Sequence, residues 1–217
     1  MPTTEELLAS LKEIANQQLA VAITWHFVAL VGITALALGW HPKRRTAGLL
    51  LALPLVSVSV LAWAAHNGFN GTVFAVLALL LGFVALREPD TRCIPKMWLR
   101  YAGFPVLVFG LVYPHFVEVS SPAAYLYAAP VGLIPCPTLA MVIGFTLLLG
   151  PPGRAYGWIL AVAGLFYGVF GVLRLGVWLD LGLIIGASLL ALAVIARDAA
   201  AARSPAQPRT RLPDPTA

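Results

Sequence analysis

Long apolar runs, each separated from the next by a short charged, proline-rich or glycine-rich segment, dominate this chain of 217 residues. A helix needs about 20 apolar residues to cross the hydrocarbon core of a bilayer. Only 11% of the residues are charged, whereas an ordinary soluble domain has about 25%. So few charges cannot solvate the surface of a soluble globule of this size. The sequence therefore predicts an all-α integral membrane protein.

The apolar runs predict about seven transmembrane helices, which form one bundle over residues 19–197. Short charged or turn-forming segments such as His41-Pro42-Lys43 and Pro151-Pro152-Gly153 separate them. The irregular stretch before the fifth helix is expected to contain a short interfacial or re-entrant helix at 123–133. The seven expected spans are 19–40, 46–66, 70–86, 97–116, 137–150, 156–173 and 177–196.

The two ends of the chain have a different character from the bundle. Residues 1–18 predict an amphipathic interfacial helix, because Leu7, Leu8, Leu11 and Ile14 recur on one face. The alternative is a helix that binds a partner. Residues 198–217 are rich in Ala, Pro and Arg without periodicity, and are expected to form a disordered cytoplasmic tail.

The lysines and arginines set the expected orientation. Only Lys12 and Arg174 of the 14 basic residues fall on one side of a seven-span arrangement. The positive-inside rule then places the C-terminus in the cytoplasm and the N-terminus outside. An arrangement with six spans would divide the arginines between the two sides. The basic residues on the expected cytoplasmic side are Lys43, Arg44, Arg45, Arg87, Arg92, Lys96, Arg100, Arg154, Arg197, Arg203, Arg209 and Arg211.

Most other ionisable residues lie towards the outer ends of the expected spans. Histidine, cysteine and carboxylate side chains suit zinc or copper, so this level of the bundle is a candidate metal or ligand site. The alternative is that these are ordinary polar residues at helix ends, with Arg174 and Asp180 paired across a turn. His26 lies deeper in its span, which favours a place inside the bundle. The candidate residues are His26, His66, His115, Glu118, Cys136 and Asp180.

The segment Ile134-Pro135-Cys136-Pro137-Thr138 is the most distinctive stretch of the chain. Pro137 suits the first position of a helix, where its missing N–H is not needed, so Cys136 is the expected N-cap. The positive end of a helix favours a thiolate, which predicts a reactive thiol or a soft metal ligand. The alternative is a small residue in a rigid turn between two prolines. Cys93 is expected on the opposite side of the membrane.

This segment resembles a family of uncharacterised bacterial multi-pass membrane proteins known only as a domain of unknown function. The resemblance rests on Tyr113-Pro114, on Pro130 and Gly132, and on Pro135-Cys136-Pro137-Thr138 opening an apolar helix that ends Leu147-Leu148-Leu149. It implies a multi-pass protein of the bacterial inner membrane and supplies no activity.

Three functions are compatible with the sequence. The first is binding or transport of a metal ion or small solute at the outer polar residues. The second is a haem b protein in which His26, His66 or His115 supplies axial ligands. The third is a non-catalytic accessory or assembly subunit of a larger membrane complex.

Small-residue pairs suggest how the helices associate. The pairs Gly164/Gly168 and Gly182/Gly186 are expected to let helices pack closely, either within the chain or in a homo-oligomer.

Catalysis is not expected, because no nucleophile–base motif is present. Nucleic-acid binding is not expected either. The chain has a net charge of +5, but its sequence contains no basic stripe with interleaved aromatic residues.

Overall fold

The computed structural model describes residues 4–118 and 121–203, and all the regular secondary structure in these ranges is helical. The helices are α1 (Thr4–Gln17), α2 (Leu19–Ala37), α3 (Arg44–Ala64), α4 (Gly68–Arg87), α5 (Met97–Leu111), α6 (Tyr125–Ala128), α7 (Pro135–Leu149), α8 (Arg154–Leu175) and α9 (Leu181–Arg203). Two short 3-10 helices precede α6 and α9, η1 (Pro122–Ala124) and η2 (Trp178–Asp180).

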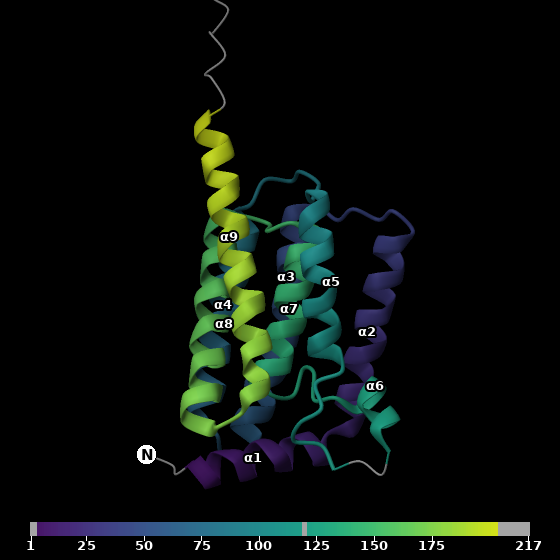
Figure 1. Cartoon of the computed structure of the whole chain (residues 1–217), viewed down its shortest axis with the longest axis vertical. Helices are drawn as coiled ribbons and strands as arrows, with labels where there is room; N and C mark the ends of the chain where they lie inside the picture. The colour runs from purple at the N-terminus through teal and green to yellow at the C-terminus, as the bar shows by residue number, and fades with distance from the viewer. Residues whose placement is uncertain (1–3, 119–120, 204–217) are drawn as a thin grey trace, which may run out of the picture.

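The long helices run side by side along the long axis, and α1 lies across one end of the bundle (Figure 1). We call this end the α1 end and the other the opposite end. Within the described residues, five helical segments are long and apolar enough to cross a membrane, namely α2, α3, α4, α8 and the segment Trp178–Ala200. The prediction of a helical bundle of membrane-crossing character is therefore confirmed. Helices α5 and α7 have 15 residues each, which gives each a length of about 22 Å.

Helix α7 is the core of the bundle. Nearly all of its side chains are buried, and α5 packs against it along its whole length. Glycines allow the two backbones to approach: a Cβ on Gly144 would lie 2.5 Å from the Leu107 backbone, and one on Gly110 2.5 Å from the Met141 nitrogen. The close α5–α7 contact therefore depends on residues without side chains.

The two glycine pairs singled out in the sequence both lie at contacts within the chain. Gly164 and Gly168 of α8 face α9, where the nearest side chains are those of Ala187 and Ile184. Gly182 and Gly186 of α9 face Phe109 and Val106 of α5 instead. The expectation of close helix packing is confirmed, with α8 against α9 and α9 against α5.

Several boundaries differ from those expected; α5, for example, ends at Leu111 although a span over 97–116 was expected. The 123–133 stretch contains η1 and α6, followed by an irregular buried segment, and α7 begins at Pro135 rather than Pro137. Helix α9 continues to Arg203, so residues 198–203 are helical although they were expected in the tail. An alanine-rich run explains this, because alanine has the highest helix propensity. The rest of the expected tail, 204–217, lies outside the described residues.

The irregular segment that leads into α7 is buried, and its backbone groups are paired inside the bundle. The Gly132 N–H donates to Thr138 Oγ1 at 2.8 Å, and Ser57 Oγ donates to the Gly132 carbonyl at 2.7 Å. Trp25 Nε1 in turn donates to Ser57 Oγ at 3.1 Å. Gly132 has φ +74° and leaves no room for a Cβ beside Trp25. Irregular backbone at membrane depth is tolerated where protein satisfies its polar groups in this way.

Candidate functional site

A buried polar cluster lies at the α1 end, where the first turn of α7 meets η2. Asp180 is only 1% exposed and accepts two hydrogen bonds, from Tyr113 Oη at 2.7 Å and from Cys136 Sγ at 3.2 Å. We call Tyr113, Cys136 and Asp180 the Cys136–Asp180 site. Its residues come from the end of α5, the start of α7 and the turn between α8 and α9, so the tertiary fold assembles it.

The two prolines of the distinctive segment position Cys136. Ile134 has extended dihedral angles and is the N-cap, Pro135 is the first helical residue, and Cys136 is the second. The expectation that Cys136 is the N-cap is therefore wrong. Both prolines fall within the first turn, where N–H groups have no intrahelical partner, so neither breaks a hydrogen bond. Their fixed φ stiffens the turn that holds the Cys136 thiol beside Asp180.

A glycine makes room for the Asp180 carboxylate. A Cβ on Gly171 of α8 would lie 1.7 Å from Asp180 Oδ2, so no other residue fits at that position without moving the carboxylate. Arg174 is exposed and makes no ion pair with Asp180. The alternative of an Arg174–Asp180 pair across the turn is therefore wrong, because the carboxylate points into the bundle.

A small cavity adjoins the site. Its volume is about 30 Å³, and a cavity of about 10–15 Å³ already has room for one water molecule. The polar residues in its wall, besides Cys136 and Asp180, are Asn70 and Tyr167, whose phenol donates to Asn70 Oδ1 at 3.0 Å. The other lining side chains are apolar or aromatic, and they include Leu7 and Leu11 of α1. A single ion or water molecule matches this space.

The electrostatic environment of Asp180 is unusual for a buried carboxylate. Its two hydrogen-bond donors, a phenol and a thiol, are neutral, and no ion pair in the described residues involves it. Burying a carboxylate without a countercharge costs several kcal/mol, so such a group takes up a proton or a cation. The Cys136–Asp180 site therefore favours the binding of a positive charge.

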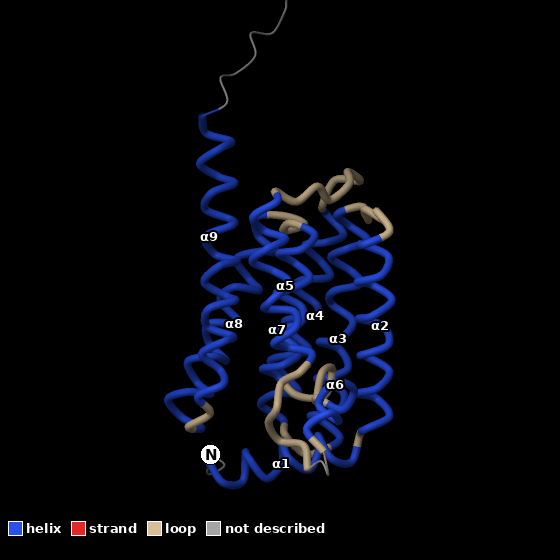
Figure 2. Tube along the Cα trace, turned by 45° about the vertical axis from the view of Figure 1, so that its right-hand side comes forward, coloured by secondary structure: helices blue, strands red, loops and turns tan. Residues whose placement is uncertain are grey.

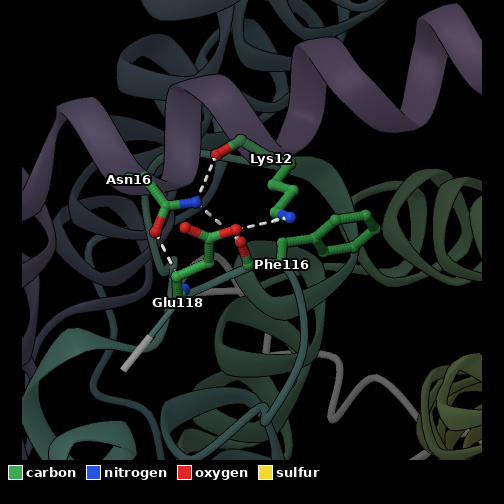
Figure 3. Close-up of polar contacts among 4 residues, drawn as sticks. All are labelled: Lys12, Asn16, Phe116 and Glu118. Atoms are coloured by element: carbon green, nitrogen blue, oxygen red, sulfur yellow. Dashed lines mark hydrogen bonds and ion pairs between the residues drawn. The ribbon is translucent and has the colours of Figure 1, made fainter. Parts of the chain in front are cut away.

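Helix α1 covers this end of the bundle and is fastened to the segment that follows α5 (Figure 3). Asn16 Nδ2 donates to the Phe116 carbonyl at 3.0 Å, and its Oδ1 accepts from the Glu118 N–H at 2.8 Å. Lys12 Nζ lies 2.6 Å from Glu118 Oε1, and this hydrogen-bonded pair lowers the pKa of the Glu118 carboxyl. We call these contacts the α1 clamp. They hold Leu11 over the cavity from outside.

Phe116 connects the clamp to the cavity. Its backbone has φ +71°, which is strained for a bulky residue, and its ring lines the cavity beside Cys136. Asn16 donates to the Phe116 carbonyl and accepts from the Glu118 N–H, and these two hydrogen bonds hold this conformation. Phe116 therefore belongs both to the α1 clamp and to the wall of the cavity.

The remaining candidate residues lie at the same end in separate surroundings. Each ring nitrogen of His26 lies 2.8 Å from a backbone carbonyl oxygen, those of Ala22 and Leu111. His66 is exposed after α3. His115 packs against the Phe116 ring, with centroids 4.2 Å apart, and partial burial lowers its pKa. Of the six candidates, the structure brings together Cys136 and Asp180 only.

The described part of the chain contains no group of three or more His, Cys, Asp or Glu side chains arranged to hold a metal ion. Any metal at the Cys136–Asp180 site would need a phenol, an amide oxygen or water as a further ligand. Cys93 is buried in the segment between α4 and α5 at the opposite end, where burial raises the pKa of its thiol.

Several residues of the site have no signal in the sequence. Tyr113 and Tyr167 resemble the other aromatic residues of apolar helices, and Gly171 resembles any small residue in a span. Tyr113 does stand in the Tyr113-Pro114 motif on which the family resemblance rests. That motif is the sequence feature that singles out Tyr113, the hydrogen-bond donor to Asp180.

No protein-family model, curated protein or solved structure matches this chain. The resemblance of the Pro135-Cys136-Pro137-Thr138 segment to a family of unknown function therefore stays a prediction.

Proposed function

We propose that the protein is a membrane-embedded binding protein that takes one metal cation at the Cys136–Asp180 site, from the α1 end. The observation that carries this proposal is the burial of the Asp180 carboxylate next to a thiol, with neutral donors and without a basic partner. A cation that replaces the proton of the Cys136 thiol would supply the missing countercharge.

The side chains of the Cys136–Asp180 site limit which metal ions can bind there. The thiol of Cys136 must lose its proton to become a ligand, and Asp180 Oδ2 lies 3.2 Å away to receive it or to bind beside it. A thiolate with carboxylate and phenol oxygens suits a borderline metal such as Zn²⁺. The 30 Å³ cavity matches one ion with a water ligand and excludes a larger solute while α1 is in place.

Binding is favoured over transport because the polar surroundings do not continue along α7. The buried polar residues of α7 are Thr138 and Thr146, and each hydroxyl donates to the carbonyl one turn earlier, of Ile134 and Val142. Both hydroxyls are thereby engaged within their own helix. The rest of the buried face of α7 is apolar.

Seven membrane crossings are part of the proposal, in the inner membrane of a bacterium, with the N-terminus outside and the C-terminus in the cytoplasm. Support comes from α2, α3, α4, α5, α7, α8 and α9, which run side by side along one axis, with α9 extending beyond the others at the opposite end (Figure 1). The buried segment before α7 extends the depth that this short helix covers, with its polar groups paired. The basic residues of the α2–α3, α4–α5 and α7–α8 connections gather at the opposite end, as the positive-inside rule requires of a cytoplasmic face.

The other two functions receive less support from the geometry. A haem needs far more room than the 30 Å³ cavity, and both ring nitrogens of His26 face backbone carbonyls. An accessory subunit needs no ligand at all. The experiment below separates it from the cation-binding function.

Metal analysis of the purified full-length protein tests the proposal. After equilibration with Zn²⁺ and removal of free metal, we expect one zinc ion per chain. Asp180→Asn and Cys136→Ser should each weaken zinc binding by at least about tenfold, because each removes a ligand. Gly171→Ala should do the same by displacing the carboxylate.

Two matched variants serve as controls. Cys93→Ser removes the other thiol, and Gly82→Ala adds a methyl group where nothing lies within 4 Å. Both should retain the zinc. Absence of stoichiometric zinc in the unaltered protein, or its retention in Asp180→Asn and Cys136→Ser, would contradict the function and leave the accessory subunit as the better explanation.

A further inference from the structure

A long apolar groove runs along α2 on the side that faces α3 and α7. It has a volume of about 610 Å³, and its wall extends from Trp25 to Trp40. These two residues are 15 positions apart on the chain, so the groove is about 22 Å long. Helix α2 lies at the edge of the bundle in both views (Figure 1 and Figure 2).

Small side chains on α2 produce this groove. Ala29, Gly32 and Ala35 face the bundle, while Phe145 and Met141 of α7 form part of the floor. Ala22 and Ala29 are the buried residues of α2, whose tertiary contacts are concentrated on α6 near the α1 end. Towards the opposite end, α2 therefore stands away from α3 and leaves the space open.

The groove continues into a basic hollow at the opposite end. This hollow has a volume of about 380 Å³ and shares Trp40 and Pro42 with the groove. Its wall contains the cationic side chains of Lys43 and Arg92, together with His41. An antiparallel backbone bridge between Lys43 and Arg92 holds the two cations side by side.

More positive than negative charge surrounds the hollow. Lys43 forms an ion pair with Asp90. Arg100 of α5 lies with Nη2 3.3 Å from Nε2 of His41, which adds a further cation at the rim. An apolar channel that opens beside clustered cations complements an amphiphile with an anionic head.

We propose that this groove and hollow bind one anionic phospholipid, with an acyl chain along α2 and the phosphate at Lys43 and Arg92. Basic pockets between transmembrane helices on the cytoplasmic side are suited to anionic lipid head groups. Trp40, at the junction of groove and hollow, lies where the ester region of the lipid would sit. This site is separate from the Cys136–Asp180 site and does not depend on it.

The basic hollow favours a lipid over a helix of another protein as the occupant of the groove. An anionic head group complements the cationic side chains of Lys43 and Arg92 at the end of the groove, which an apolar helix would not do. The groove, with a volume of about 610 Å³, has room for a single hydrocarbon chain.

Native mass spectrometry of the full-length protein, delipidated in detergent, tests the proposal. Added phosphatidylglycerol should be retained as one molecule per chain, with about tenfold preference over phosphatidylcholine of the same acyl chains. The Lys43→Gln/Arg92→Gln variant should lose this preference. Ala35→Phe, which fills the groove, should retain neither lipid. If its phenyl ring lowers the thermal midpoint of the protein, the smaller substitution Ala35→Leu serves as the test variant instead.

Matched controls keep the result specific. Arg87→Gln removes a cation at the same end but outside the hollow, and Leu30→Phe enlarges an exposed residue of α2 outside the groove. Both should bind lipid as the unaltered protein does. Glycerophosphoglycerol, which has no acyl chains, should not displace phosphatidylglycerol from the protein. If it did, the ligand of the hollow would be a free phosphate ester and not a lipid. Equal retention of both lipids, or unchanged binding in the hollow and groove variants, would overturn the proposal.

Discussion

Gly144→Ala should lower the thermal midpoint of the detergent-purified protein by about 6 °C. The added Cβ would lie 2.5 Å from backbone atoms of Leu107, and backbone cannot rotate away as a side chain does. Overpacking a tight contact typically costs about 1–3 kcal/mol, and 1 kcal/mol corresponds to about 2–4 °C for a domain of this size. Static light scattering or intrinsic fluorescence during heating measures the change.

Gly82→Ala is the matched control for this prediction. Gly82 lies in α4, a helix of comparable apolar character, and nothing lies within 4 Å of its added Cβ. Alanine favours a helix over glycine by about 1 kcal/mol, so this variant should be unchanged or slightly more stable. Equal midpoints for the two variants would show that α5 and α7 are not in close backbone contact.

Release of α1 should expose the Cys136 thiol. In a Cys93→Ser background, where Cys136 is the only thiol, Asn16→Ala should raise the labelling rate by a membrane-impermeant maleimide roughly tenfold. The variant removes two hydrogen bonds to the Phe116 segment, each worth about 1 kcal/mol. Quenched labelling of intact cells, read by mass shift of the protein, measures the rate.

Three further variants test the contribution of the α1 clamp. Gln17→Ala alters the neighbouring exposed amide, which bonds to Glu13 within α1, and should leave the labelling rate unchanged. Glu118→Lys should accelerate labelling, and the charge exchange Lys12→Glu/Glu118→Lys should slow it again by restoring the ion pair. Identical rates in all variants would mean that α1 does not control access. Labelling of Cys93 but not Cys136 in the unaltered protein would reverse the proposed orientation.

The fold was largely predictable because bilayer thickness ties span length to hydrophobicity. Runs of about 20 apolar residues became α2, α3, α4, α8 and α9. The expected spans 97–116 and 137–150 became 15-residue helices. Apolar composition could not place these ends, because buried irregular backbone is as apolar in sequence as a helix. The non-helical segment before α7 instead has its Gly132 backbone groups paired with Ser57 and Thr138, which hydropathy does not reveal.

The candidate site was predictable only in part. Threading the spans placed Cys136 and Asp180 at one level of the bundle, and these two residues do meet. The histidines at that level do not join them, because a shared depth says nothing about which face of a helix a residue occupies. Tyr113 contributes a hydrogen bond to Asp180, and Gly171 leaves space for its carboxylate. Both contributions depend on how the helices pack, which hydropathy does not reveal.

Optical titration with Co²⁺ tests most directly whether Cys136 and Asp180 ligate a metal together. In the Cys93→Ser background, a thiolate-to-cobalt charge-transfer band in the near ultraviolet should grow to saturation at one equivalent. It should vanish in Cys136→Ser and require much higher cobalt concentration in Asp180→Asn. A spectrum without this band at saturating Co²⁺, or a band that survives Cys136→Ser, would contradict cation binding at this site.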